Sequence, residues 1–288
     1  MSIPGFTEHA FTRDGVELSY SRGGSGLPLL LLHGFPQTRA MWMHVAPALA
    51  ETHDVICPDL RGYGNSAKPG PVSAYSFREM ARDQLAVMGH LGFERFAVAG
   101  HDRGGRVAHR LALDAPEAVT RLCVMDIVPT ATLLAPLRRE VAQSYYHWFF
   151  LAQPAPLPET LIGHDPDLYF ESCLSGWGGA GLAEFDDKQL AAYRAAWRDP
   201  ETIRGMCNDY RAALMHDFDD DSADADARVH CPTWVFYGAQ GAMAGAYDVP
   251  AVWSGKCTEM SAQAIRGGHF FVDTNPGDTS AALRAFLD

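Results

Sequence analysis

One aspartate in this chain stands where a strained turn would expose it for chemistry. Asp102 lies in the segment Gly-His-Asp-Arg-Gly at positions 100–104, after the apolar run 96–99 and before the helical-looking stretch 105–113. Glycines on both sides permit a tight strand-to-helix turn in which backbone packs closely on backbone. A nucleophile flanked in this way by small residues defines a nucleophile elbow. The sequence therefore predicts that Asp102 is a nucleophile.

An aspartate at the elbow restricts the reaction. The usual occupant of such an elbow is serine, so Asp102 argues against a serine hydrolase. A carboxylate that attacks an acyl carbon gives a labile anhydride. A carboxylate that attacks a saturated carbon bearing a leaving group gives an ester, which water can cleave. The elbow thus predicts dehalogenation or epoxide opening.

A base and an acid should complete the site. His269, in Gly-Gly-His-Phe after the last apparent strand, is the natural base. An acid must orient its imidazole and stabilise the charged form. Asp126 ends the strand that follows the elbow helix, whereas Asp248 follows the next strand and is the alternative. We favour Asp126, because open parallel sheets place their sites at the carboxyl ends of strands.

The segment His33-Gly34-Phe35-Pro36 follows the apolar run 27–32, which is typical of a central strand buried on both faces. In a hydrolase of this kind the loop supplies one oxyanion-hole amide, here the Phe35 N–H. The second is the backbone N–H of Arg103. These donors would stabilise the oxyanion that forms when water attacks the ester.

Two arginines follow the elbow. Arg103 and Arg106 stand one and four positions after Asp102, so one helix should carry both close to it. Together they can hold a substrate carboxylate by charge-assisted hydrogen bonds. The formal net charge of −12 makes such a local cationic pocket necessary for an anionic substrate. Taken alone, an arginine at a helix start more often pairs with a surface acid, and we assign Arg110 to that structural role.

Strand and helix patterns alternate around these residues. A hairpin is predicted at Asp14-Gly15, and short strands at 54–57, 96–99, 122–125 and 233–237. Amphipathic helices are predicted at 41–49, 77–91 and 103–113. This alternation predicts an α/β fold with a mostly parallel sheet flanked by helices. The rhythm breaks after residue 128, so we expect a core at 1–128 and 225–288 with an inserted helical cap at 129–224.

Composition excludes several classes of function. The acidic balance argues against nucleic-acid or anionic-membrane partners. The six cysteines include no CxxC pair, so we expect reduced thiols. No signal peptide and no apolar run of about 20 residues is visible, so a soluble cytoplasmic protein is expected. The acidic run 217–221 is interpreted as a solvated linker rather than a metal site.

The chain resembles the fluoroacetate dehalogenase family, the 2-haloacid dehalogenases of the α/β-hydrolase fold. The resemblance covers nearly the whole chain, and an arginine directly after the nucleophile and the pair His147-Trp148 are its more specific features. It rests on these segments: His33-Gly34-Phe35-Pro36-Gln37-Thr38 with Trp42, Pro58 to Gly64, Gly100 to Val107, Asp126 to Thr130, Tyr146-His147-Trp148 and Gly268-His269-Phe270.

The resemblance implies an α/β-hydrolase fold with a mostly parallel eight-stranded sheet and a helical cap. It implies that Asp102 displaces halide, that His269 and Asp126 activate water, and that Arg103 and Arg106 grip the substrate carboxylate. The leaving halide would be bound by three further residues, His147, Trp148 and Tyr210. Tyr145 and Tyr146 compete with Tyr210 for this role. The family further implies a homodimer and a small anionic haloacid as substrate, with no metal or organic cofactor.

Two other readings remain open. An epoxide hydrolase shares the aspartate–histidine–acid machinery and needs two cap tyrosines, which this chain can supply. A cation directly after the nucleophile suits an anionic substrate better than a neutral epoxide. A non-catalytic protein on a hydrolase scaffold would be marked by loss of a catalytic residue, and Asp102, His269 and Asp126 are all present.

Overall fold

The computed structural model describes residues 3–135, 137–176 and 180–288. An eight-stranded sheet lies at its centre, in the order β1-β2-β4-β3-β5-β6-β7-β8. The strands are β1 Thr7–Arg13, β2 Val16–Gly24, β3 Leu27–Leu32, β4 His53–Pro58, β5 Phe96–His101, β6 Val119–Met125, β7 Thr233–Gly238 and β8 Met260–Ile265. Strand β2 pairs antiparallel with β1 and with β4. All other neighbouring strands, from β4 to β8 in this order, pair in parallel. The predicted mostly parallel eight-stranded sheet is confirmed.

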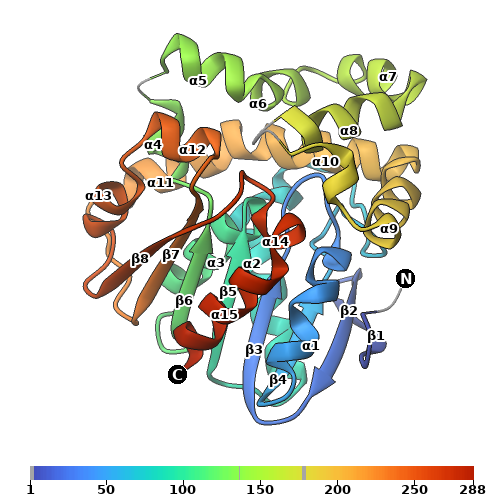
Figure 1. Cartoon of the computed structure of the whole chain (residues 1–288). Helices are drawn as coiled ribbons and strands as arrows, with labels where there is room; N and C mark the ends of the chain where they lie inside the picture. Colours follow the sequence, from blue (N-terminus) through green and yellow to red (C-terminus); the bar gives the residue numbers. More distant parts are fainter. Residues whose placement is uncertain (1–2, 136, 177–179) are drawn as a thin grey trace.

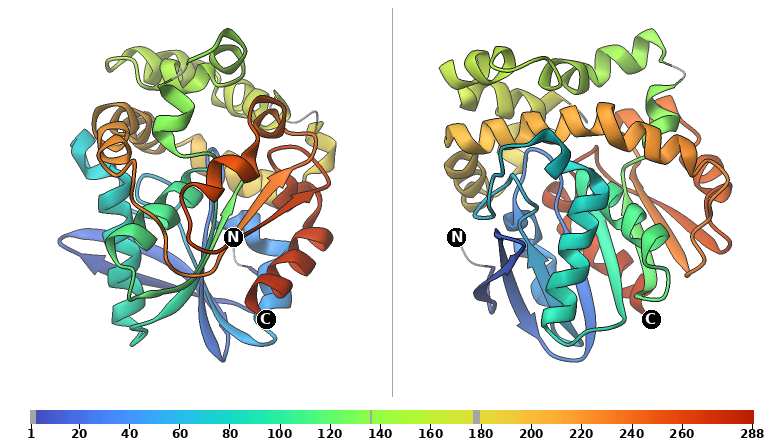
Figure 2. Two further views of the ribbon diagram at one scale, coloured as in Figure 1. Left: turned by 90° about the vertical axis from the view of Figure 1, so that its left-hand side faces the viewer. Right: turned by 180° about the vertical axis from the view of Figure 1, so that it is seen from behind.

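Helices cover both faces of this sheet. Helices α1 (Ala46–Leu49) and α15 (Pro276–Leu287) pack together on one face, and α2 (Phe77–His90) and α3 (Arg103–Asp114) pack together on the other (Figures 1 and 2). The central strands consequently have no exposed face, and Leu29 to Leu32 are completely buried. The remaining short elements of the core are η1 Arg39–His44, η2 Val72–Tyr75, α12 Ala242–Ala246, α13 Val249–Ser254 and α14 Phe271–Thr274.

A layer of helices between β6 and β7 lies across one end of the sheet (Figure 1). Its elements are α4 Thr130–Leu134, α5 Arg139–Ser144, α6 Tyr146–Leu151, α7 Leu157–His164, α8 Pro166–Gly176, η3 Leu182–Glu184, α9 Asp187–Trp197, α10 Pro200–Ala212, the π-helical segment η4 Ala213–Asp217 and α11 Phe218–Ala223. We propose that this insertion, residues 129–224, acts as the cap of the site below it.

The prediction of one continuous helix at 41–49 was wrong. The structure has a 3₁₀ helix, η1, capped by the Thr38 side chain, and then the separate short helix α1. Pro47 lies in the first turn of α1. Proline has no N–H to donate to the carbonyl four residues earlier, so one α-helical ladder cannot run through this position.

The acidic run 217–221 is not a solvated linker. It is helical, and Asp217 is only 3% exposed. The Asp217 carboxylate accepts a hydrogen bond from the Phe77 N–H at 2.8 Å, and Asp221 accepts one from the Ala131 N–H at 2.8 Å. These acids therefore tie the end of the cap to helix starts elsewhere. Local charge density could not reveal those donors, because they are distant in the sequence.

The sequence analysis also made predictions about the cysteines and about membrane-spanning helices. All six cysteines are free, and five of them are buried. Among the residues described, no helix has both the length and the apolar character that crossing a bilayer requires.

Candidate active site

The turn at Asp102 is strained. Asp102 adopts φ 49° and ψ −115° between β5 and α3, a region that non-glycine residues rarely occupy. The glycines beside it permit this approach: a Cβ on Gly100 would lie 2.2 Å from the Gly104 carbonyl oxygen, and one on Gly104 would lie 2.4 Å from that of His33. Backbone strain of this kind persists only where the surrounding structure enforces it, and it gathers at functional sites.

The two carboxylate oxygens of Asp102 have different environments. Oδ1 accepts a hydrogen bond from the Phe35 N–H at 2.9 Å. Oδ2 lies 3.9 Å from Nε2 of His269, too far for a direct hydrogen bond. Burial alone would raise the pKa of Asp102, but the charges of His269, His101 and Arg103 and the Phe35 amide lower it to about 2. Asp102 is therefore an anion with one oxygen held and the other available.

The imidazole of His269 contacts Asp126. Nδ1 of His269 lies 2.6 Å from Oδ2 of Asp126, while Oδ1 of Asp126 accepts the Gly238 N–H at 2.8 Å. Burial disfavours the imidazolium, yet the hydrogen bond and charge of Asp126, together with the charge of Asp102, raise the pKa of His269. Asp248, the alternative acid, is exposed and caps α13 through the Ala251 N–H. The structure thus brings Asp126, and not Asp248, to His269.

Arg103 is bound by a residue that the sequence analysis did not single out. Its side chain is completely buried, and its Nε and Nη2 atoms donate to the carboxylate of Asp209 in α10. Nη2 also donates to the Asp209 backbone carbonyl at 3.0 Å. The guanidinium lies over the rings of Phe77, Trp148 and Tyr210. Burial opposes the charged form, but the charge and hydrogen bonds of Asp209, together with Tyr210 and Tyr63, raise the pKa of Arg103.

Arg106 has a different environment. Nη1 donates to the Val128 carbonyl at 2.9 Å and to the Thr130 hydroxyl at 3.1 Å. Within residues 3–135, 137–176 and 180–288, no carboxylate oxygen lies within 4.0 Å of its nitrogens. Burial and the nearby charge of Arg103 lower the pKa of Arg106. The guanidinium lies 4.7 Å from the centroid of the Trp148 ring.

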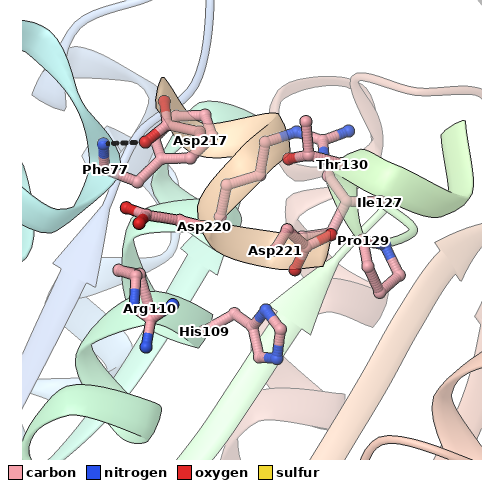
Figure 3. Close-up of a pocket in the computed structure, with 10 residues that line it drawn as sticks. Phe77, His109, Arg110, Ile127, Pro129, Thr130, Asp217, Asp220 and Asp221 are labelled. Atoms are coloured by element: carbon pink, nitrogen blue, oxygen red, sulfur yellow. Dashed lines mark hydrogen bonds between the residues drawn. The ribbon is translucent and has the colours of Figure 1, made fainter. Parts of the chain in front are cut away.

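Arg106 also lines a small pocket between α3 and the end of the cap, whose other lining residues are labelled in Figure 3. Asp217, Asp220 and Asp221 line the same pocket, yet none of them forms an ion pair with Arg106. The cavity volume is about 20 Å³, which suits a water molecule rather than a substrate. The acids of this pocket therefore make no direct ion pair with Arg106, although the charge of Asp221 acts on it from farther away.

The three predicted halide-binding residues lie together in the cap. His147 and Trp148 belong to α6 and Tyr210 to α10, and these helices pack against each other. The Tyr210 ring centroid is 5.5 Å from that of His147, 5.3 Å from that of Trp148 and 5.1 Å from that of Phe35. Burial lowers the pKa of His147 well below its usual value and raises that of Tyr210. Both rings are therefore neutral, and Tyr210 keeps its proton.

The competing tyrosines both contact His147. The Tyr146 ring centroid lies 6.1 Å from that of His147 in an edge-on arrangement, but Tyr146 is 44% exposed, whereas the Tyr145 ring centroid lies 5.9 Å from it. Tyr145 lines a small cavity of about 10 Å³ with Asp102, Asp126 and His269, and its hydroxyl lies 3.9 Å from Sδ of Met243. Sequence reasoning named Tyr145 only as an alternative halide donor. Its place beside the carboxylates of Asp102 and Asp126 depends on how α5 and α6 fold back over the sheet.

Metal ligands are not gathered in the part of the chain that the structure describes. No group of three or more histidine, cysteine or acidic side chains is placed to hold a metal ion there. The charged groups of the site instead contact each other and backbone amides.

Comparison with known proteins agrees with this architecture. The family model for the α/β hydrolase fold matches residues 28–276. The chain belongs to the α/β-hydrolase family, and within it to the group that includes fluoroacetate dehalogenase.

Three relatives illustrate this relationship. The fluoroacetate dehalogenase of Burkholderia sp is 50% identical over 98% of this chain and 94% of its own length. A soluble epoxide hydrolase of Corynebacterium sp. (strain C12) is 32% identical over 94% of this chain and 93% of its own. A solved α/β hydrolase from Nostoc sp PCC 7120 superposes with a TM-score of 0.96 at 43% identity, covering 99% of both chains.

Proposed function

We propose that this hydrolase removes halide from short 2-haloacids, converting fluoroacetate or chloroacetate to glycolate. One observation carries the proposal: the anionic Asp102 lies near a buried cation, Arg106, that forms no direct ion pair with a carboxylate among the described residues. A substrate with a carboxylate and a reactive neighbouring carbon would supply that partner and meet the nucleophile at once. The 50% identity to a fluoroacetate dehalogenase supports the same substrate class.

In the first proposed step, Oδ2 of Asp102 attacks the carbon that bears the halogen. The carbon–halogen bond breaks with both electrons on the halide, and an ester forms between Asp102 and the substrate. Oδ1 keeps its hydrogen bond to the Phe35 N–H at 2.9 Å and becomes the ester carbonyl oxygen. The oxyanion donor therefore already contacts the atom that will later carry charge.

In the second proposed step, His269 takes a proton from water, which attacks the ester carbon of Asp102. Asp126 stabilises the imidazolium that forms, through the contact of 2.6 Å. The tetrahedral oxyanion is stabilised by the backbone amides of Phe35 and Arg103. Collapse breaks the bond to the glycolate oxygen, which takes the proton from His269, and the carboxylic acid left on Asp102 releases its proton to solvent, so that both groups return to their starting states. Carboxylate and imidazole thus perform both half-reactions without a metal or organic cofactor.

The aromatic cluster of the cap would receive the leaving halide. His147, Trp148 and Tyr210 are each no more than 2% exposed. Fluoride is a poor leaving group because it is strongly hydrated, so donors in a dry pocket must replace water as it departs. Neutral N–H and O–H groups can do so without holding the halide as tightly as a buried cation would.

Epoxide opening is the second candidate, and two tyrosines favour it. Tyr145 and Tyr210 both lie near Asp102, and a 32% identical relative is an epoxide hydrolase. The charge of Arg103 is already compensated by Asp209, so it no longer distinguishes the two reactions. Arg106 does distinguish them, because a neutral epoxide would leave this buried cation without a directly paired carboxylate.

Halide release tests the proposal. Purified protein at neutral pH is given fluoroacetate, chloroacetate and bromoacetate, and styrene oxide is assayed in parallel. Fluoride release is the expected result. Chloride or bromide without fluoride would retain the mechanism and reject the fluoride-selective role of the cap. Diol from the epoxide with no halide from any acid would replace dehalogenation by epoxide hydrolysis.

A further inference from the structure

The two arginines of the elbow helix are not equivalent. Three of the N–H bonds of Arg103 are directed to Asp209, through Nε and Nη2. The side chains of Arg103 and Asp209 are both completely inaccessible to solvent. Asp209 is fixed further by the Tyr63 hydroxyl, which donates to it at 2.6 Å. Only Nη1 of Arg103 has no hydrogen-bond partner among the residues that the structure describes.

The ion pair changes what Arg103 can offer a ligand. In a water-excluded site, a charge acts on its surroundings together with its counter-ion, because no solvent screens either of them. A ligand carboxylate that approaches Arg103 also approaches the carboxylate of Asp209. The attraction to one is largely cancelled by repulsion from the other. Arg106 has no such acid within 4.0 Å in the described chain, and the charges of Asp102 and Asp221 act on it from farther away, so it keeps more of its attraction than Arg103 does.

We propose that Asp209 is a positioning residue that determines specificity: it neutralises Arg103 and leaves Arg106 as the cation that selects a monoanionic substrate. Arg103 then contributes its backbone amide and the remaining N–H groups of Nη1, held in one orientation. This inference rests on the proposed function, since it assigns the charge recognition within that site.

The cap position of Asp209 supports this assignment. Asp209 immediately precedes Tyr210, so the residue that fixes Arg103 and the predicted halide donor share one turn of α10. The guanidinium of Arg103 also lies 4.3 Å from the Tyr210 ring centroid. The ion pair therefore fixes the elbow helix against the cap at the point where the substrate's two ends would be recognised.

A double-mutant cycle tests the inference. Arg103→Gln, Asp209→Asn, their combination and Arg106→Gln are compared with the parent protein. The readout is the ratio of kcat/KM for chloroacetate to kcat/KM for the neutral analogue chloroacetamide. A general loss of folded protein lowers both values equally and leaves this ratio unchanged. Arg110→Gln is the matched control, because Arg110 is on the same helix but pairs with Asp114 and Asp224.

The expected results separate charge from structure. Arg103→Gln alone lowers the ratio by about 100-fold, because Asp209 remains as an unpaired buried anion. Adding Asp209→Asn to Arg103→Gln raises the ratio again by at least about tenfold. Arg106→Gln lowers the ratio by about 100-fold, and Arg110→Gln leaves it unchanged. A double variant as poor as Arg103→Gln would overturn the proposal, since Arg103 itself would then select the carboxylate.

Two further measurements keep the test decisive. If Arg103→Gln does not fold, the double variant decides: a ratio within about tenfold of the parent supports the inference, and a loss equal to that of Arg106→Gln rejects it. Acetate binding, measured by calorimetry in the same variants, needs no turnover. A parent protein that releases no halide would reject the proposed function, while the acetate series would still test Asp209.

Discussion

The core half and the cap half of the site stabilise their polar groups in opposite ways. In the core, Asp102, Asp126 and His269 form a charged set held by backbone amides at the ends of parallel strands. In the cap, His147 and Tyr210 are neutral rings packed against other rings. The contrast matches the two tasks we propose, since bond making needs fixed charge and halide departure needs neutral donors.

The difference also shows what each half depends on. The charges of the core stay in place because each contacts a strand end or an elbow whose backbone is rigid. The cap donors are placed by packing between α6 and α10, and by the ion pair of Arg103 with Asp209. A substitution in the core should therefore stop chemistry, whereas one in the cap should alter substrate choice.

Removal of the base gives the largest expected effect. His269→Asn should reduce turnover by at least about 10³-fold, because no group is left to activate water. The ester on Asp102 should then accumulate and be visible as added mass in the intact protein. Asp102→Asn is the control, since it should lose turnover without any adduct. Accumulation of the same adduct in Asp102→Asn would show that the nucleophile is another residue.

An intermediate effect is expected in the cap. Tyr210→Phe should lower kcat/KM for fluoroacetate by about 10- to 100-fold, because one hydrogen bond to a developing anion is lost. The loss for bromoacetate should be smaller, since bromide needs less help to leave. Tyr146→Phe, on an exposed tyrosine of the same cap, is the matched control. Equal losses for both halides in Tyr210→Phe would assign the ring to packing.

The smallest expected effect is a difference in pH dependence between the two steps that we assign to His269 and Asp102. The pKa of His269 is raised above 6.5, and its imidazole must be neutral to accept a proton. Steady-state turnover should therefore fall about tenfold for each pH unit below that pKa. The initial burst of halide should not fall over the same range, because the pKa of Asp102 is about 2. Stopped-flow measurement of halide at several pH values compares the two; a burst that falls with turnover would contradict the separation.

Much of the core could be predicted from local sequence. The run 27–32 is continuous and apolar, and it forms β3 with the same bounds. The helix expected at 41–49 failed, because the tight turn capped by Thr38 and the position of Pro47 compete with a regular helix. The prediction of a solvated linker at 217–221 was wrong for another reason. The N–H groups that donate to these acids, including that of Phe77, belong to distant segments.

The sequence by itself determined the elbow and the residue that we propose as the nucleophile. The small residues at 100 and 104 act on their immediate neighbours, so Asp102 could be identified from five consecutive positions. Only the tertiary structure decided that Asp126 contacts His269 and that Asp248 does not. It alone revealed Asp209, which pairs with Arg103 across 106 positions of the chain. Strain is encoded locally, whereas the charge that a site presents depends on which distant groups folding buries together.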